Sequence, residues 1–267
     1  MENAVIVERD GSVATVVLNR PDRMNTINEV LLDGVLAALE SLADDTDIRV
    51  VILTGAGRAF CAGGDLQGMA AGLAGGLKGP ESKAGKVSAL RRVMKTSELL
   101  HQMPKPTIAS INGAAAGAGL SWALACDLRF CADTAVFNTA FATAGLSGDF
   151  GGTWFLPRLV GAGKAAELYL LAQKFNASEA ARVGLVNRVF SSHRLSVEVR
   201  QVADRLCSLS PLALRAIKEN LIDSATCSLA EQLDAEARRH ITTGLTDDAK
   251  EAAAAFLEKR APVFRGS

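Results

Sequence analysis

The sequence lacks an excess of charge of either sign. Lysine and arginine together number 29 among the 267 residues, and aspartate and glutamate also number 29. Nucleic acids and anionic membranes are bound chiefly through an excess of positive charge, so this composition gives no reason to expect either as a partner. A small or medium-sized ligand is the better expectation.

Paired cysteines and long apolar runs are lacking as well. The five cysteines are scattered and form no CxxC pair, which argues against a disulfide framework and against a zinc site. Charges interrupt every apolar run before about 18 residues, and Met1-Glu2-Asn3 is not a basic leader. We therefore expect a cytoplasmic protein with buried free thiols, no signal peptide and no membrane-spanning helix.

The signature motifs of several enzyme classes are also missing. Ser121 lies in no GxSxG elbow, the glycine-rich turns complete no GxGxxG fingerprint, and no GK[ST] phosphate loop occurs. His101, His193 and His240 lie in unrelated segments without metal-ligand spacing, and we expect them at the surface or in loops. A serine hydrolase, a dinucleotide-binding domain and a metalloenzyme are thus disfavoured.

One stretch of small residues stands out against these absences. Thr107 to Ile111 predicts a buried strand that ends at Asn112-Gly113, and Leu120 to Cys126 predicts a buried helix. Between them, Ala114 to Gly119 carry nothing larger than a methyl group, so a ligand could approach the main chain closely. The start of a helix presents unpaired N–H groups, so we interpret this stretch as an oxyanion-binding turn.

The residues before this stretch predict a layer of strands and one helix. A hairpin turns at Asp10-Gly11, a helix capped by Asn28 runs to about Leu42, and a buried strand covers Val50 to Thr54. A second turn rich in glycine and alanine follows from Gly55 to Asp65. We interpret Gln67 to Lys86 as a mobile loop or lid because it is rich in glycine and alanine.

The residues after residue 86 predict helices and short strands, and later helices alone. A helix is expected over Val87 to Gln102, and another glycine-rich turn from Leu146 to Thr153 precedes a further helix. Ser178 is expected to cap a short helix. After His193 the chain predicts almost nothing but helix, which divides it into a sheet-rich core at 1–193 and a helical region at 194–267.

Four motifs, in order along nearly the whole chain, resemble the crotonase superfamily, the enoyl-CoA hydratase/isomerase family. They are Ala59-Phe-Cys-Ala-Gly-Gly-Asp65, Ile111-Asn-Gly-Ala-Ala-Ala-Gly-Ala-Gly119 with Ala125-Cys-Asp127, Gly151-Gly-Thr153 with Leu156-Pro-Arg-Leu-Val-Gly161, and Phe256-Leu-Glu-Lys-Arg-Ala-Pro-Val-Phe264. The resemblance implies an α/β fold, a spiral of ββα units with a C-terminal helical region. It also implies assembly as a homotrimer or a dimer of trimers.

The same resemblance implies an acyl-CoA thioester as substrate and no separate cofactor, because coenzyme A is part of the substrate. Matched by position, the oxyanion hole consists of the backbone N–H groups of Gly64 and Ala118. The positions matched to CoA binding are Arg23, Met24, Ala62, Gly64, Asp65 and Leu66, with Phe256 and Lys259 closing the pocket from the same or a neighbouring subunit.

The catalytic carboxylates depart from the family's best-known member. Its two glutamates fall here on Ser121 and Phe141, and neither side chain can act as a carboxylate base. Asp149 is the acid that remains in this region, at a position resembling the isomerase branches of the superfamily. The dehalogenase branch is disfavoured because its histidine base falls on Met94.

One carboxylate is enough for a double-bond isomerase, since the same group can remove a proton beside the thioester carbonyl and return it two carbons further along. We therefore predict an isomerase of fatty-acid or aromatic-acid breakdown with Asp149 as the base. Two alternatives remain, an enoyl-CoA hydratase with unconventional residues and a non-catalytic acyl-CoA-binding scaffold. Asp149 could also simply cap the helix that begins near Gly151.

Overall fold

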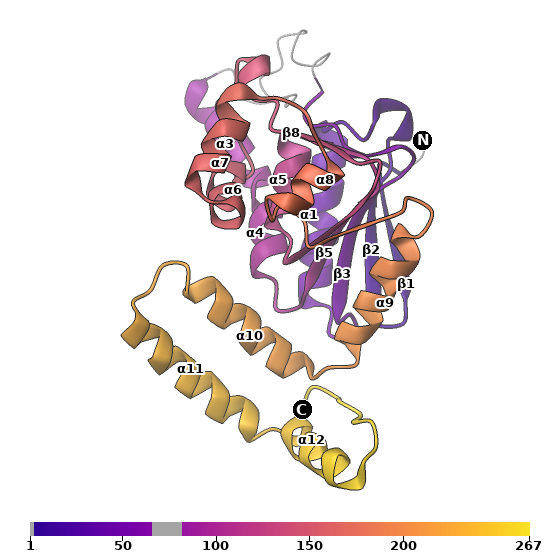
Figure 1. Cartoon of the computed structure of the whole chain (residues 1–267), viewed down its shortest axis with the longest axis vertical. Coiled ribbons are helices and arrows are strands. Elements are labelled where there is room, and N and C mark those ends of the chain that lie inside the picture. Colours follow the sequence, from indigo (N-terminus) through magenta and orange to yellow (C-terminus); the bar gives the residue numbers. More distant parts are fainter. Residues whose placement is uncertain (1–2, 66–81) are drawn as a thin grey trace.

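Two β-sheets that share the turns of one spiral form the frame of the molecule (Figure 1). The computed structural model describes residues 3–65 and 82–267. The larger sheet has the order β1-β2-β3-β5-β7-β10, formed by Val5–Asp10, Val13–Leu18, Val50–Gly55, Thr107–Ile111, Leu128–Ala132 and Arg188–Phe190. The smaller sheet has the order β4-β6-β8-β9, formed by Ala59–Cys61, Ala114–Ala116, Val136–Asn138 and Phe175–Asn176.

The spiral arises because each turn gives one strand to each sheet. Strands β3, β5 and β7 lie parallel in the larger sheet, and the strand after each of them, β4, β6 and β8, joins the smaller one. Helices then return the chain to the next turn, as in the segments from β5 through α5 (Ala118–Ala125) to β7. The predicted α/β spiral of ββα units is thereby confirmed.

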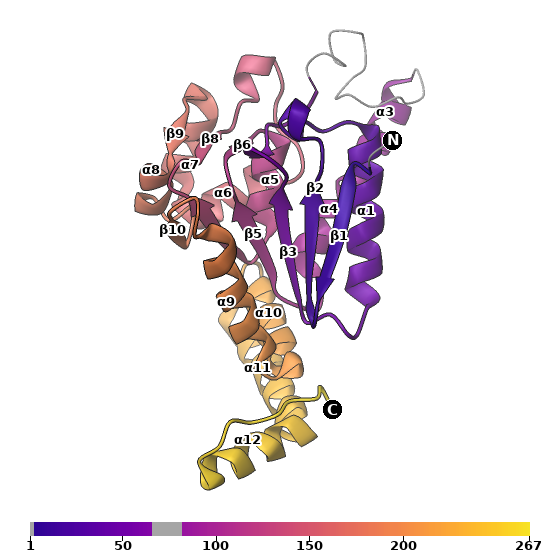
Figure 2. The same ribbon diagram turned by 90° about the vertical axis from the view of Figure 1, so that its right-hand side faces the viewer.

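Helices cover both faces of the larger sheet. On one face, α1 (Glu29–Asp44) buries Leu31, Val35 and Leu39 in the main core. On the other face, α9 (Leu195–Cys207) buries Leu195, Val199 and Ala203 against the strands (Figure 2). Within the described residues the core also contains α3 (Lys83–Val93), α4 (Lys95–Gln102), α6 (Gly152–Val160), α7 (Ala162–Leu171) and α8 (Ala177–Arg182).

Several local predictions are confirmed and two are wrong. Strands β1 and β2 pair antiparallel, and the side chain of Asn28 caps α1 by accepting a hydrogen bond from the Leu31 N–H at 3.0 Å. The predicted helix over 87–102 is instead two helices, α3 and α4, which meet at Met94. Asn176, not Ser178, caps α8 through the Glu179 N–H.

The predicted loop at Gln67 to Lys86 falls mostly outside the described residues. Its last residues, from Lys83 on, belong to α3, and Ser82 caps that helix by accepting from the Gly85 N–H at 3.1 Å. None of the helices within the described ranges is both long and apolar enough to cross a membrane.

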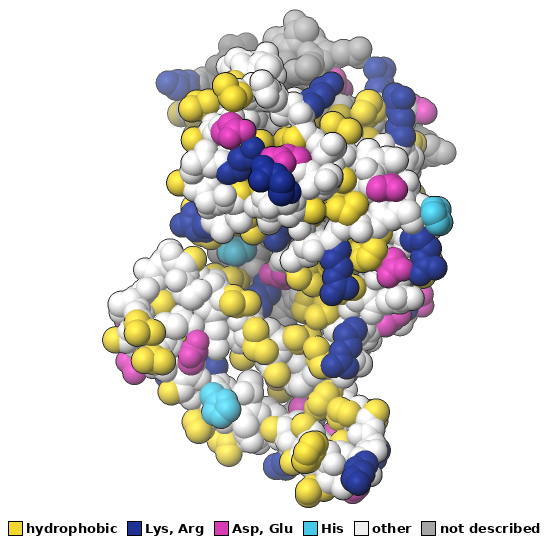
Figure 3. Space-filling view, viewed as in Figure 1, with side chains coloured by type: hydrophobic (Ala, Val, Ile, Leu, Met, Phe, Trp, Pro, Cys, Tyr) yellow, Lys and Arg dark blue, Asp and Glu magenta, His cyan; other side chains and the backbone are white. Residues whose placement is uncertain are grey.

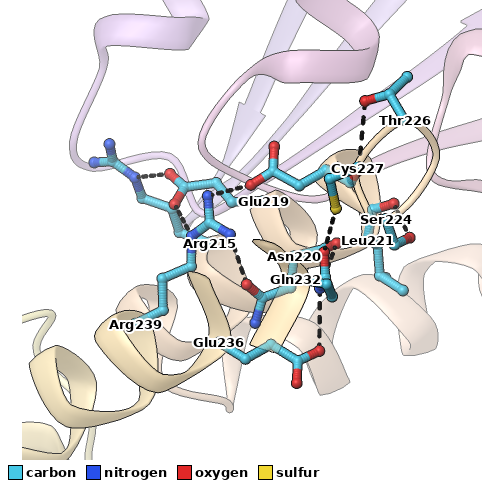
Figure 4. A network of polar contacts seen from close by, with 11 residues as sticks. Arg215, Glu219, Asn220, Leu221, Ser224, Thr226, Cys227, Gln232, Glu236 and Arg239 are labelled. Carbon is cyan, nitrogen blue, oxygen red and sulfur yellow. Dashed lines mark hydrogen bonds and ion pairs between the residues drawn. The ribbon is translucent and has the colours of Figure 1, made fainter. Parts of the chain in front are cut away.

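The tail, residues 211–267, extends away from the core and contains α10 (Pro211–Asp223), α11 (Leu229–Gly244) and α12 (Asp247–Glu258) (Figure 2). Helices α10 and α11 lie side by side, and Arg239 of α11 donates to Asn220 and forms ion pairs with Glu219 and Asp223 of α10 (Figure 4). The predicted division at residues 193/194 stays a prediction. In the structure α9 packs against the larger sheet, and the chain leaves the core only after this helix.

Candidate active site

The stretch Ala114 to Gly119, predicted as a turn, is instead strand β6 (Ala114–Ala116), the single connecting residue Gly117 and the start of α5. Gly117 has φ +51° and ψ −126°, a conformation available to glycine, and Ala118 is the first residue of α5. The N–H of Ala118 therefore has no carbonyl within its own helix to pair with. A side chain on Gly119 would lie 2.4 Å from the carbonyl oxygen of Cys61, so glycine there allows α5 to contact the end of β4.

Gly64 lies on a second turn that adjoins the first. Ile27 forms a parallel bridge with it, donating from its N–H to the Gly63 carbonyl at 2.8 Å and accepting from the Asp65 N–H at 3.1 Å. In such a bridge the N–H of the middle residue, Gly64, points away from the partner strand. A side chain on Gly63 would lie 2.9 Å from the carbonyl oxygen of Ala116, so the two turns are in close contact.

Most of the residues matched to CoA binding gather beside Gly64. The N–H of Ala62 donates to the carbonyl of Met24 at 3.1 Å, and Arg23 directly precedes Met24 at the end of a short 3₁₀ helix, Pro21–Arg23. Asp65 lies 3.9 Å from the guanidinium of Arg20 in the same loop. Leu66 lies outside the described residues. The structure thus brings four of the predicted positions together with Gly64.

Buried Asn25 holds these two loops in place. Its side-chain amide donates to the carbonyls of Ala56 at 3.0 Å and Ala59 at 2.8 Å, and its carbonyl oxygen accepts from the Arg20 N–H at 2.8 Å. Met24 and Asn25 both have positive φ, 50° and 55°, a conformation that costs free energy in residues other than glycine. The hydrogen bonds of Asn25 stabilise the strained loop against β4.

Asp149 lies in a strained loop before α6 and does not cap that helix. The N-cap is Gly151, which makes no side-chain cap hydrogen bond, and the Asp149 backbone carbonyl accepts from the Gly152 N–H at 3.2 Å. Phe150 has φ +49°, which is rare for a bulky residue. The alternative of Asp149 as a helix cap is therefore wrong. Strain of this kind is typical of functional loops.

The carboxylate of Asp149 is poorly solvated and unpaired. Its Oδ1 is buried and has no hydrogen-bond partner in the part of the chain that the structure describes. Burial raises the pKa of Asp149 to about 6. Burial, and to a lesser extent the charge of Asp149, raise the pKa of the Cys61 thiol to about 12. Asp149 is therefore close to the end of β4, where the turn of Gly64 begins.

Ser121 and Phe141 line the same region, as their positions in the motifs predict. Ser121 is 1 % exposed on α5, and its hydroxyl donates to the Gly117 carbonyl at 3.3 Å. The ring of Phe141 stacks on Tyr169 of α7 at a centroid distance of 6.2 Å. Tyr169 was not among the predicted site residues. The signal that could have found Tyr169 is its spacing of four residues from Ala165, which places both on the same side of α7.

Phe256 and Lys259 are not brought to this site within one chain. Both belong to the end of α12, which lies at the far end of the tail (Figures 1 and 2). Phe256 is 83 % exposed. Their predicted role in closing a pocket therefore requires a neighbouring subunit and stays a prediction.

The expected surface position is wrong for His101. This residue of α4 is half-buried between the rings of Trp154 and Phe155, each at a centroid distance of 5.3 Å, and its Nε2 is buried without a partner among the described residues. Burial lowers the pKa of His101 below its usual value. No group of histidine, cysteine and acidic side chains that could hold a metal ion occurs in residues 3–65 and 82–267.

Comparison with known proteins agrees with this geometry. The family model described as Enoyl-CoA hydratase/isomerase matches residues 8–267. The chain belongs to the enoyl-CoA hydratase/isomerase family. Within this family it is 35% identical over 266 residues to the 1,2-epoxyphenylacetyl-CoA isomerase of Escherichia coli K12, covering 100% of both chains.

Other members of the family carry hydratase names. The chain is 34% identical over 261 residues to the short-chain-enoyl-CoA hydratase of Clostridium acetobutylicum, covering 97% of this chain and 96% of that one. The crystal structure of an enoyl-CoA hydratase from Bacillus anthracis superposes with a TM-score of 0.91 at 34% identity, covering 99% of this chain and 100% of that one. The family is thus shown, and both reaction types occur within it.

Proposed function

We propose that the protein is an enoyl-CoA double-bond isomerase that holds a thioester enolate between two backbone N–H groups. The observation that carries the proposal is Asp149, an unpaired and partly desolvated carboxylate close to the adjoining turns of Gly64 and Ala118. A relative from Arabidopsis thaliana that is named as a peroxisomal Delta(3,5)-Delta(2,4)-dienoyl-CoA isomerase, 34% identical over 264 residues, supports it. Coenzyme A enters as part of the substrate, and the proposal includes no separate cofactor.

In the proposed reaction, the thioester carbonyl oxygen accepts hydrogen bonds from the N–H groups of Gly64 and Ala118. The Asp149 carboxylate removes a proton from carbon 2 of a 3-enoyl thioester, and the electrons of that C–H bond pass into a dienolate. Asp149 then returns the proton to carbon 4, which leaves the double bond between carbons 2 and 3. Each backbone donor contributes about 3–4 kcal/mol to stabilising such an oxyanion.

The raised pKa of Asp149 suits this role. A base with a pKa of about 6 is largely ionised at neutral pH, yet it binds a proton more readily than an ordinary aspartate does. The positions of Ser121 and Phe141 offer no carboxylate to activate water. For this reason we favour isomerisation over hydration, although hydratases are equally similar in sequence.

The test is to supply trans-3-hexenoyl-CoA and follow the appearance of the 2-enoyl isomer. Wild-type protein should convert it, and Asp149→Asn should lower kcat by about 10³-fold or more while ester binding, measured by calorimetry, is retained. The control is Asp47→Asn, which changes an exposed acid far from the site and should leave kcat unchanged.

Three outcomes would contradict the proposal. Full activity of Asp149→Asn would exclude this carboxylate as the base. Hydration of 2-hexenoyl-CoA by the wild-type protein at a rate above that of isomerisation would instead favour the hydratase alternative. Binding of the ester without any turnover would favour the scaffold.

We also propose that copies of the chain assemble as a trimer or a dimer of trimers through the tail. Apolar side chains lie exposed along its helices, with Leu221, Leu233 and Leu245 more than half exposed, and apolar atoms are spread over this part of the surface (Figure 3). Such a surface is typical of a protein interface. Light scattering of the purified protein should give three or six times the mass of one chain, and a monomer would contradict the assembly.

A further inference from the structure

Two hydroxyl groups meet beside Asp149. If Gly152, the first residue of α6, carried a Cβ, that atom would lie 2.4 Å from the hydroxyl oxygen of Tyr169 and 2.5 Å from that of Ser121. The two hydroxyls, from α7 and α5, therefore converge on one point where only glycine leaves them room. The N–H of Gly152 donates to the carbonyl of Asp149, which places this point next to the carboxylate-bearing loop.

Neither hydroxyl makes all the hydrogen bonds it could with the part of the chain that the structure describes. That of Tyr169 makes no hydrogen bond to any part of residues 3–65 and 82–267, and that of Ser121 donates to the Gly117 carbonyl at 3.3 Å, which leaves its lone pairs free. The neighbouring surface is aromatic, since Phe141 stacks on Tyr169. Both hydroxyls can therefore form a further hydrogen bond with a polar group of a ligand.

The hydroxyl pair also lies at a defined place along the substrate. Ser121 follows Ala118 by three residues on α5, about one helical turn, or ~5 Å. A thioester carbonyl held by the Ala118 N–H therefore places the next few carbons of the acyl group near Ser121 and Tyr169. Burial first, and the charge of Asp149 second, raise the pKa of Tyr169 above its usual value, so the phenol stays protonated and able to donate.

We propose that Tyr169 and Ser121 select acyl-CoA esters that carry an oxygen substituent, such as a hydroxyl group, on carbon 3 or carbon 4. The Tyr169 hydroxyl donates to the substituent oxygen, and a hydroxyl substituent donates in turn to the Ser121 oxygen. This inference rests on the thioester placement in the proposed function, but it does not depend on the isomerisation step.

The test compares butyryl-CoA, 3-hydroxybutyryl-CoA (both enantiomers) and 4-hydroxybutyryl-CoA by isothermal titration calorimetry. In the wild-type protein one of the hydroxy esters should bind at least about 10-fold more tightly than butyryl-CoA. Tyr169→Phe keeps the ring stacked on Phe141 and should reduce this preference to about threefold or less, without changing the affinity for butyryl-CoA. The matched control is Thr143→Val, which removes an exposed hydroxyl that donates to the Ala140 carbonyl and should leave the preference intact.

The outcomes separate this inference from the proposed function. Equal affinity for all the esters in the wild-type protein, or an undiminished preference in Tyr169→Phe, would overturn the role of the hydroxyl pair. Failure of every ester to bind would contradict the acyl-CoA site itself. Because the titration requires no turnover, loss of the isomerase assignment alone would leave its result valid. Tyr169 is the one tyrosine of the sequence, so an ultraviolet difference spectrum that appears with the preferred hydroxy ester, and not with butyryl-CoA, provides a second measurement.

Discussion

The core and the tail use their apolar side chains differently. In the core, Leu31, Leu53 and Trp122 are wholly buried, whereas in the tail Leu221 and Leu245 are 69% and 74% exposed. Polar contacts join the tail to the core, among them the bond of Lys218 to Asp127, and Figure 3 shows apolar atoms spread over the surface of the tail. The core thus buries its apolar side chains within the chain, whereas the tail leaves many of its own uncovered.

Lys218 is the clearest of the polar contacts that hold the tail. Its ammonium group is buried under α10 and donates to the Asp127 carboxylate at 2.7 Å and to the Lys105 carbonyl at 3.1 Å. Arg49 of the core donates to the Phe264 carbonyl at 2.8 Å near the C-terminus. These bonds tie α10 and the C-terminal segment to the core.

The largest expected difference between core and tail concerns glycine. Gly119→Ala should lower the free energy of unfolding by about 3 kcal/mol or more and abolish turnover, because the new methyl group collides with the backbone of Cys61. Gly244→Ala at the end of α11 meets nothing within 4 Å and should be neutral or stabilise by up to about 1 kcal/mol. Chemical denaturation of both variants checks this, and similar losses would contradict the difference in packing.

Polar anchoring of the tail should show the next largest effect. Lys218→Met leaves the Asp127 carboxylate without its buried cation, so we expect a loss of about 2–4 kcal/mol in the free energy of unfolding. Arg215→Met on the same helix breaks an exposed pair with Glu219 and should cost less than about 1 kcal/mol. Equal costs in urea titrations would mean that Lys218 does not anchor the tail.

The smallest expected effect concerns Asp149 of the core, because burying its ionised carboxylate lowers the free energy of unfolding. Burial raises the pKa of Asp149 from 3.8 to about 6, so the folded state binds the proton more tightly than the unfolded state does. Stability is therefore lost as pH rises from about 4 to 6, and the cost is complete above pH 6. Asp149→Asn should stabilise by about 1–3 kcal/mol at pH 8 and by much less near pH 4. Thermal unfolding at both pH values measures this, and a destabilised variant at pH 8 would contradict it.

Much of the core was predictable because its signals are local. Strand β5 is a continuous apolar run that ends at Asn112-Gly113, and Asn28 precedes a helix with regular apolar spacing. The motifs singled out Gly64, Ala118 and Asp149, and the structure places Gly64 and Asp149 in loops and Ala118 at the start of α5, while their roles stay predictions. The break at Met94 was missed because apolar residues continue at helical spacing across it.

The long-range features could not be read from the sequence. The convergence of the Tyr169 and Ser121 hydroxyls beside Gly152 depends on how α7 and α5 each pack against α6, and nothing in the residues around position 169 specifies that arrangement. The burial of His101 between Trp154 and Phe155 likewise depends on the packing of α6 against α4. Apolar spacing identifies the inward side of a helix, but it does not identify what that side contacts.

The pH dependence of the isomerisation of trans-3-hexenoyl-CoA tests the central claim most directly. If Asp149 is the base, log(kcat/KM) should be level above neutral pH and should fall with a slope of one below an apparent pKa of about 6, as the carboxylate becomes protonated. A rate that stays constant between pH 5 and pH 8 would contradict the assignment of Asp149.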